Sequence, residues 1–104
     1  MIVIYTNEAE KDLEDITNYL LQYNEPNVVA KRISKVKKDV ELLERTPNIG
    51  TRLNNICEIK SDYRFLVSSK YLIIYLIAKD YLGIISVLDG RQDWQKAFFT
   101  KRGE

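Results

Sequence analysis

The sequence predicts an α+β fold of order β-α-α-β-β-β, in which a helical hairpin packs on one face of a small, mainly antiparallel sheet. In the first half of the chain, apolar residues recur every three or four positions, which is the period of an amphipathic helix. In the second half they alternate with polar residues or form short continuous runs, as strands do. With 104 residues, 45% of them hydrophobic, the chain can build one core, so we expect a single domain over residues 1–104.

The N-terminal half is expected to form one strand and two helices. Residues 2–6 are mostly β-branched and aromatic, which favours a strand, and Asn7 follows as a helix N-cap. The first helix is expected to end near Asn24, and a turn at Pro26 separates it from a second helix that ends near Thr46. Each helix has one apolar face, formed by Ala9, Leu13, Ile16, Leu20 and Tyr23 and by Val29, Ile33, Val36, Val40 and Leu43. A turn this short predicts an antiparallel hairpin.

A loop is expected from Pro47 through Asn55, followed by three strands. Residues 57–67 alternate between apolar and polar side chains, which predicts one buried face formed by Cys57, Ile59, Tyr63, Phe65 and Val67. In residues 71–78 and 82–88, apolar side chains occupy both odd-numbered and even-numbered positions, so both faces of these strands must be covered. In the last strand, strict alternation groups Ile85 with Val87 and separates them from Leu82, Ile84 and Leu88.

The helical hairpin can cover only one face of such a sheet. The other face must be closed by C-terminal aromatic residues or by another protein. The C-terminal candidates are Trp94, Phe98 and Phe99, in a segment that is expected to be a short helix or tail.

The two predicted helices carry opposite charge. Carboxylates near a helix N-terminus are stabilised by about 0.3 to 1 kcal/mol each, which explains the acids of the first helix. These are Glu8, Glu10, Asp12, Glu14 and Asp15. The second helix carries a cationic run without an acid, formed by Lys31, Arg32, Lys35, Lys37 and Lys38. A solvated helix face is the simpler interpretation of this run, and contact with phosphates or with an acidic protein is the alternative.

Composition excludes several classes of site. The net charge of +1 does not by itself indicate a nucleic-acid or membrane partner. Histidine is absent, which removes Ser-His and Cys-His nucleophile pairs, and the single Cys57 can form neither an internal disulfide nor a zinc site alone. The longest apolar stretch, residues 71–78, is far shorter than the roughly 20 residues of a membrane-spanning helix. We therefore expect a cytoplasmic protein without cofactor, metal or membrane contact.

The ordered layout and two segments resemble the RelE/ParE superfamily of toxins from bacterial type II toxin-antitoxin systems. The segments are residues 71–75, Tyr-Leu-Ile-Ile-Tyr, and 87–94, Val-Leu-Asp-Gly-Arg-Gln-Asp-Trp. The N-terminal half adds Ala9, Asp12, Leu13, Ile16, Tyr19, Pro26, Ala30, Ile33, Leu43, Pro47 and Gly50. The resemblance covers nearly the whole chain. It implies a growth-inhibiting toxin that is neutralised by a small DNA-binding antitoxin and that contacts operator DNA only through the toxin-antitoxin complex.

The superfamily divides by target, and this chain is more similar to the ParE-like branch. RelE-like members cleave mRNA on the ribosome with Lys and Arg side chains on the sheet and a Tyr near the C-terminus. Here Leu72 stands where that branch tends to place Arg, and Phe98 and Phe99 lack a hydroxyl. ParE-like toxins, whose family activity is to poison DNA gyrase by binding, are instead resembled by the run Gly90, Arg91, Asp93 and Trp94.

The resemblance implies gyrase inhibition by protein-protein contact, with Arg64, Arg91 and Trp94 as the predicted target-binding residues. Trp94 is expected to pack first and to contact a target second. Arg91 can instead pair within the chain with Asp89 or Asp93. The predicted antitoxin-binding surface consists of Leu72, Ile74, Leu76, Phe98 and Phe99.

Two alternatives to gyrase inhibition stay open. One is a ribosome-dependent, metal-independent endoribonuclease, with a carboxylate base and cations supplied by Glu58, Lys60, Arg64 and Arg91. The structural interpretation of Glu58, Lys60 and Arg64 is an exposed ladder of opposite charges, worth a few tenths of a kcal/mol. The other alternative is a superfamily member that has lost toxicity and survives as an antitoxin-binding module.

Overall fold

The structure is a computed structural model that describes residues 1–55 and 61–101. Its elements are β1 (Ile2–Tyr5), α1 (Asn7–Leu21), α2 (Pro26–Arg45), β2 (Thr51–Arg52), the 3-10 helix η1 (Leu53–Asn55), β3 (Arg64–Ser68), β4 (Tyr71–Ile77), β5 (Tyr81–Asp89) and α3 (Trp94–Lys101). The strands predicted at residues 2–6, 71–78 and 82–88 are confirmed to within one residue at each end. None of the helices in the described part of the chain has the length and apolar composition needed to cross a membrane.

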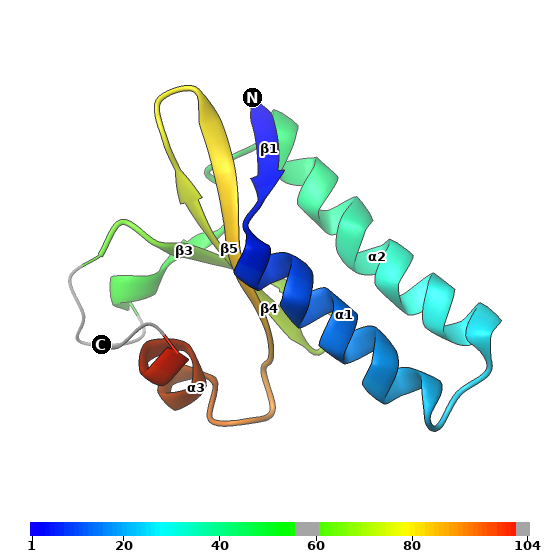
Figure 1. Ribbon diagram of the computed structural model, residues 1–104. Helices are drawn as coiled ribbons and strands as arrows, with labels where there is room; N and C mark the ends of the chain where they lie inside the picture. The colour runs from blue at the N-terminus through cyan, green and yellow to red at the C-terminus, as the bar shows by residue number, and fades with distance from the viewer. Residues whose placement is uncertain (56–60, 102–104) are drawn as a thin grey trace.

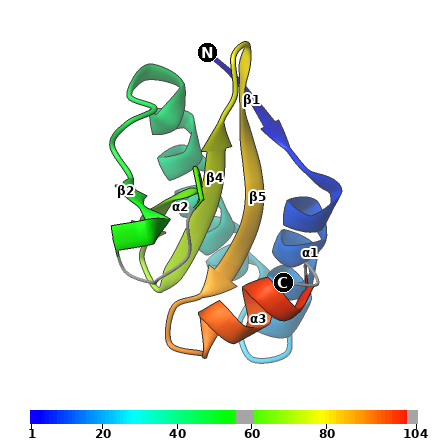
Figure 2. The ribbon, with the colours of Figure 1, turned by 90° about the vertical axis from the view of Figure 1, so that its left-hand side faces the viewer.

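The sheet has five strands in the order β1-β5-β4-β3-β2. β1 runs parallel to β5, and the other neighbouring pairs are antiparallel. α1 and α2 lie side by side against one face of the sheet (Figure 1), and the view turned by 90° shows α3 in front of the opposite face (Figure 2). The predicted α+β fold, with a helical hairpin on a mainly antiparallel sheet, is confirmed.

Thr6 joins β1 to α1 and is the N-cap of that helix. Its backbone stays extended, with φ −69° and ψ 163°, and its Oγ1 accepts a hydrogen bond from the amide of Ala9 at 3.1 Å. The hydroxyl also donates to the carbonyl of Ile84 at 2.9 Å, which ties the start of the helix to β5. The prediction of Asn7 as N-cap is therefore wrong by one residue, because Thr6 serves the helix and the neighbouring strand together.

Asp12 continues this connection further along α1. The residue is 7% exposed, and its Oδ2 accepts hydrogen bonds from Ser86 Oγ at 2.7 Å and from the amide of Val87 at 3.0 Å. β1 pairs with β5 only as far as Ile84, so Asp12 supplies an acceptor for a β5 amide that β1 does not reach. α1 is thereby fixed to β5 beyond the end of β1.

α1 ends at Leu21, earlier than the predicted end near Asn24. The side-chain amide of Asn24 donates to the carbonyl of Leu20 at 3.0 Å, which satisfies one acceptor of the last turn. Tyr23 consequently leaves the apolar face and is 71% exposed, so its predicted place on the buried face is wrong. Its ring lies against that of Tyr19, with the centroids 5.4 Å apart.

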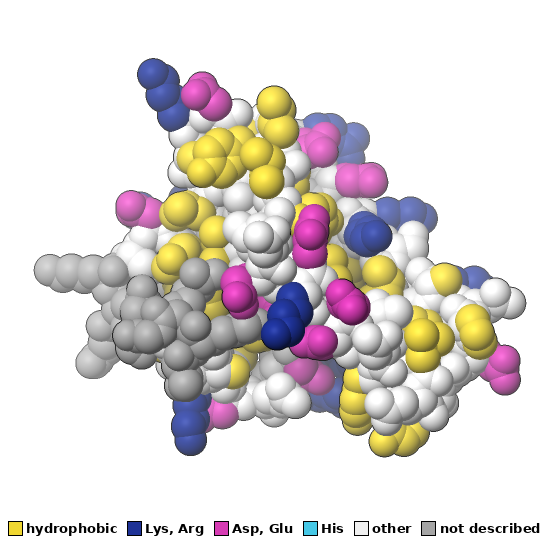
Figure 3. All heavy atoms as spheres, in the orientation of Figure 1, with side chains coloured by type: hydrophobic (Ala, Val, Ile, Leu, Met, Phe, Trp, Pro, Cys, Tyr) yellow, Lys and Arg dark blue, Asp and Glu magenta, His cyan; other side chains and the backbone are white. Residues whose placement is uncertain are grey.

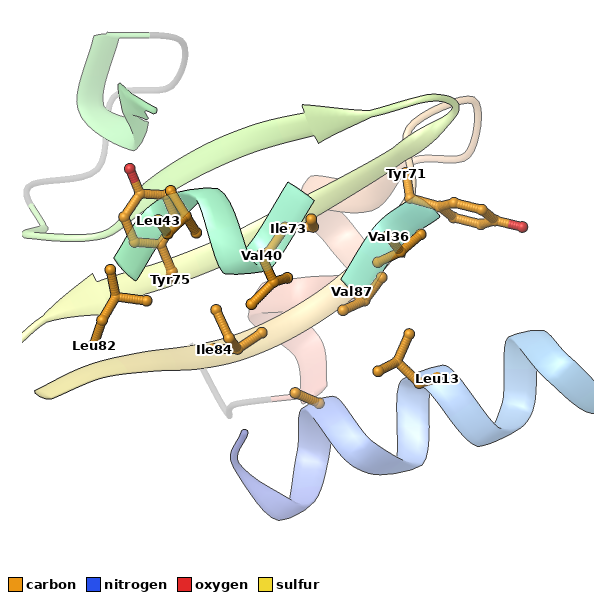
Figure 4. Packing of buried hydrophobic residues seen from close by; sticks show 11 residues of the cluster. Leu13, Val36, Val40, Leu43, Tyr71, Ile73, Tyr75, Leu82, Ile84 and Val87 are labelled. Atoms are coloured by element: carbon orange, nitrogen blue, oxygen red, sulfur yellow. The ribbon is translucent and has the colours of Figure 1, made fainter. Parts of the chain in front are cut away.

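The main hydrophobic core lies between the helical hairpin and the sheet. Its buried members are Ala9, Leu13, Val36, Val40, Leu43, Tyr71, Ile73, Tyr75, Leu82, Ile84 and Val87. Figure 4 shows side chains from α1, α2, β4 and β5 meeting in this layer, with Tyr71 and Tyr75 at its two ends. The helical side of this core is supplied, as predicted, by Ala9, Leu13, Ile16, Val36, Val40 and Leu43. Leu20 and Val29 are also buried, but they are not members of this cluster.

A β-bulge in β5 decides which of its residues face this core. The register of β4 with β5 skips Ile85, which is the extra residue. Beyond it the two faces of the strand exchange, so that Val87 joins Leu82 and Ile84 in the core while Leu88 lies on the opposite side with Ile85. The predicted grouping of these residues is wrong, because strict alternation takes no account of an inserted residue.

α3 covers the opposite face of the sheet. The buried residues of this second cluster are Leu53, Ile74, Phe98 and Phe99, and Tyr63, Phe65, Ile85, Leu88 and Trp94 pack against it. The rings of Phe98 and Tyr63 meet edge to face, with their centroids 5.5 Å apart. The sequence left open whether C-terminal aromatic residues or another protein cover this face. The C-terminal aromatic residues of the chain do cover it.

The segment around β3 departs most from the prediction. Cys57 and Ile59 lie outside the described residues. Val67 is 58% exposed, so its predicted burial is wrong, because the cluster under α3 extends to Phe65 and does not include Val67. The loop expected through Asn55 is also wrong in its last part: β2 pairs with β3, and η1 places Leu53 in the second cluster.

Replacing Asp12 by Ala should lower the free energy of unfolding by about 2 kcal/mol, because the buried donors of Ser86 and Val87 lose a charged acceptor. Urea denaturation measures the loss. Asp15→Ala is the control, since Asp15 is an exposed acid of the same helix. Equal losses in the two variants would contradict the role given to Asp12.

Candidate functional site

The turn after β5 contains residues 90–94, the run that resembles ParE-like toxins. Gly90 donates its amide to the carbonyl of Lys70 at 2.8 Å, which closes the end of the β4–β5 ladder. A Cβ at position 90 would lie 2.6 Å from Leu72 Cδ1 and 3.2 Å from the Lys70 carbonyl oxygen. A larger residue at this position would therefore press on the Lys70 carbonyl and require the Leu72 side chain to shift.

Arg91 is held by Asp89, one of the two internal partners that the sequence offered. The guanidinium donates from Nε to Asp89 Oδ1 at 3.2 Å and from Nη2 to Oδ2 at 3.0 Å, and the amide of Arg91 also donates to Oδ1 at 2.9 Å. The hydrogen bonds from the Arg91 side chain are the main reason why the pKa of Asp89 lies below its ordinary value. The Arg91 side chain nevertheless remains 69% exposed, so the pair fixes its direction without burying it.

The other members of this run build α3. Asp93 precedes the helix, and its Oδ1 accepts a hydrogen bond from the amide of Lys96 at 3.3 Å, as an N-cap residue does. Trp94 is partly buried against the cluster that contains Ile74 and Phe98. The structure thus places Trp94 in a packing position, and Asp93 is engaged in starting the helix rather than in pairing with Arg91.

A groove of about 530 Å³ separates α1 from the turn after β5. Asp15 and Tyr19 on α1 form one wall, and Tyr71 and Arg91 are among the residues of the other. Burial raises the pKa of the Tyr71 hydroxyl and nearby Asp89 raises it further, while Arg32 and Arg91 act in the opposite direction. Sequence reasoning identified Arg91 but not the groove, since its walls come from elements that only the tertiary packing brings together.

Arg64 lies in a different environment. Its Nη1 donates to the carbonyl of Gly50 at 2.9 Å and, more weakly, to that of Asn48 at 3.5 Å. The hydroxyl of Tyr75 supports the same loop: it accepts from the amide of Gly50 at 2.9 Å and donates to the carbonyl of Pro47 at 2.8 Å. Arg64 therefore holds in place, through these hydrogen bonds, the segment that connects α2 to β2.

The two arginines do not share one site. In the register of the sheet Arg64 lies opposite Tyr75, and Asp89, which holds Arg91, lies opposite Tyr71. These positions on β4 are four residues apart, or about 13 Å along the strand at the usual rise per residue. Glu58 and Lys60, the other members of the predicted cleavage set, lie outside the described residues. Within residues 1–55 and 61–101, no three acidic or thiol side chains gather as a metal site.

The predicted antitoxin-binding residues come from β4 and from α3. Ile74 and Phe98 are 0% and 1% exposed, Leu72 and Phe99 are also buried, and Leu76 is half-buried. Ile74, Phe98 and Phe99 bury one another in the free chain, whereas Leu72 and Leu76 are not members of that cluster.

The Asp89–Arg91 pair predicts a measurable titration. In carbon-13 NMR, the Asp89 carboxylate should titrate below the ordinary range of about 3.9, and Arg91→Gln should return it toward that range. A carboxyl whose folded pKa is depressed stabilises the fold above its unfolded pKa and loses that contribution as the pH falls through the folded value. Asp39, whose pKa is lowered by Lys35 and Ser68 against the effect of burial, is the internal control. If Arg91→Gln leaves Asp89 unchanged, the pair does not exist in solution.

Comparison with known proteins agrees with this architecture. The chain superposes on one from a solved structure described as "Chromosomal ParDE TA system from P. aeruginosa", with a TM-score of 0.74, 18% identity, and coverage of 86% of this chain and 95% of that chain. At this identity the likeness is one of fold. No curated protein matches the sequence. The sequence profile of a family described as "ParE toxin of type II toxin-antitoxin system, parDE" matches residues 3–94. The resemblance to the ParE-like branch is thereby confirmed, and the chain belongs to the ParE toxin family of type II toxin-antitoxin systems.

Proposed function

We propose that this chain inhibits DNA gyrase by binding it in the cytoplasm and that a cognate antitoxin neutralises it. The observation that carries the choice of binding over RNA cleavage is the separation of Arg64 from Arg91. Each has its own partner, the carbonyl of Gly50 for Arg64 and the carboxylate of Asp89 for Arg91. Family membership supports the gyrase target as the typical one.

Cleavage of RNA requires a base, an acid and cations that converge on one phosphate. The two described cations of the candidate set are each engaged elsewhere, Arg64 by the Gly50 carbonyl and Arg91 by Asp89. The β4 positions opposite Arg64 and Asp89 are about 13 Å apart along the strand, which does not favour convergence on one phosphate. Leu72 and Phe98 add neither charge nor hydroxyl, and both are buried. This arrangement favours a toxin that binds its target over one that cleaves RNA.

The groove beside Arg91 is suited to a protein target. Asp89 orients the guanidinium before binding, which reduces the conformational entropy that an interface must overcome. Tyr19 stands on the α1 wall and is 58% exposed. Tyr and Arg are among the residue types that contribute most to binding energy at protein interfaces. In this proposal Arg91 contacts gyrase, whereas Trp94 acts by fixing α3, and Arg64 by fixing the loop at Gly50.

The antitoxin is proposed to bind the sheet face formed by Leu72, Ile74 and Leu76. Because Ile74 is buried in one cluster with Phe98 and Phe99, an antitoxin that uses this face would replace those two side chains with apolar side chains of its own. The antitoxin then contacts operator DNA in the assembled toxin-antitoxin complex.

The test is one purified preparation assayed on two targets, a gyrase supercoiling reaction and ribosomes translating a defined mRNA. The proposal predicts loss of supercoiling with the mRNA intact. Codon-spaced cleavage with unaffected supercoiling would establish the endoribonuclease instead. Inactivity in both assays, together with normal growth on expression, would indicate a non-toxic antitoxin-binding module.

A matched pair of variants locates the contact. Arg91→Ala should weaken gyrase inhibition about tenfold or more, since truncation of a hot-spot side chain costs about 2 kcal/mol or more and each step of about 1.4 kcal/mol is tenfold. Arg45→Ala removes an equal charge from an exposed position at the end of α2 and should leave inhibition unchanged. Urea denaturation of both variants separates lost contact from lost folding, and equal inhibition by Arg91→Ala and the unmodified chain would remove Arg91 from the interface.

A further inference from the structure

The five cations of α2 differ in their surroundings in the folded chain. Lys37 lines a hollow toward α1 together with Glu10 and Glu14, so its charge has acidic neighbours. Lys31, Arg32 and Lys35 line hollows without an acid in their walls, although Lys35 is paired with Asp39 of its own helix. Lys38 lines one such hollow and another that includes Glu41. Figure 3 shows acidic side chains gathered over α1. The cationic run in the sequence therefore becomes a basic surface around Lys31, Arg32 and Lys35, with Asp39 paired to Lys35.

This surface is hollowed where α2 meets the turn between β3 and β4. A depression of about 420 Å³ is lined by Lys31, Arg32, Lys35, Ser69, Lys70 and Tyr71. A second one, of about 450 Å³, continues along α2 and shares Lys31 and Lys35 with the first. Together they form a trough, which we call the basic trough, with cations contributed by a helix and by a hairpin turn.

Two contacts fix the positions of these cations. Lys35 Nζ lies 2.6 Å from Asp39 Oδ2, and the same oxygen accepts from Ser68 Oγ at 2.6 Å, so Asp39 connects α2 to the end of β3. Lys70 Nζ lies 5.5 Å from the centroid of the Tyr71 ring. Ser69, with φ at +55°, makes the tight turn that brings Lys70 to the trough. Asp39 is thus engaged with Lys35 and Ser68, at one end of the trough.

We propose that the basic trough binds the phosphate backbone of duplex DNA. Several cations around one depression match a multiply charged ligand better than an isolated carboxylate. Proteins that bind single strands generally stack bases on exposed aromatic rings, and the one ring in the trough, Tyr71, is 4% exposed. A duplex keeps its bases stacked inside and presents only phosphates to such a surface.

The helix supplies cations at spacings that suit a charged backbone. Lys31, Lys35 and Lys38 lie on one stripe, and the first and last are about 10 Å apart at the helical rise per residue. The net charge of the chain is only +1, so attraction to DNA depends on this local arrangement. The contact is direct and independent of sequence, in addition to any contact made through the antitoxin, and it does not depend on gyrase as the target.

Fluorescence anisotropy of a labelled duplex of about 20 base pairs, titrated with the purified chain between about 50 and 200 mM salt, tests the proposal. The double variant Lys31→Gln/Arg32→Gln should weaken binding and reduce the slope of log K against log salt by about 2, one for each phosphate contact. The matched control is Lys37→Gln/Arg45→Gln, which removes the same charge from exposed positions of α2 outside the trough.

Each outcome decides the matter. A change of slope confined to the trough variant supports the proposal. Equal changes in both variants would show that overall charge is responsible, and salt-independent or absent binding at about 50 mM would also overturn it. A single strand of equal length, or polyglutamate, bound more tightly than the duplex would overturn the assignment in favour of single-stranded nucleic acid or an acidic protein. Gyrase inhibition is not used as a readout, so failure here leaves the proposed function standing.

Discussion

The hydrogen bonds that Asp12 accepts from Ser86 and Val87 hold the two halves of this fold together. β5 pairs with β1 only up to Ile84. Beyond that point, the hydroxyl of Ser86 and the amide of Val87 donate hydrogen bonds to Asp12 of α1. At the start of α1, Thr6 adds a further contact with β5: it caps the helix and also donates a hydrogen bond to the carbonyl of Ile84. The direction of α1 across the sheet, and with it the wall of the groove that faces Arg91, follows from this junction.

Lys70 and Tyr71 lie where the groove and the basic trough meet. Both residues line the groove toward α1 and the trough toward α2, so the two surfaces share one wall. Gyrase acts on DNA, and a toxin that bound both would present Arg91 to the protein and α2 to the duplex from adjacent faces. The two proposed contacts therefore lie on adjacent surfaces, which share Lys70 and Tyr71 but differ in Arg91 and in the cations of α2.

The periodic parts of the fold could be predicted from sequence, because helix and strand periods are local properties. The apolar faces from Ala9 to Leu20 and from Val29 to Leu43 are examples. The bulge at Ile85, the capping by Thr6 and the burial of Leu53 depend on residues distant in sequence, which periodicity cannot represent. The same division holds for the site. The pairing of Arg91 with Asp89 was among the local candidates, whereas the loop carbonyls that engage Arg64 and the groove walls arise only on folding.

The central claim is that this toxin acts by occupying its target and not by turnover. The most direct measurement is the number of toxin molecules needed per target in a reaction that contains both gyrase and translating ribosomes. At gyrase concentrations above the dissociation constant, binding predicts that the toxin concentration for half inhibition of supercoiling rises in proportion to the gyrase concentration, while mRNA stays intact. Loss of mRNA at toxin amounts far below the number of ribosomes would contradict the account, because only a catalyst can act on many targets in turn.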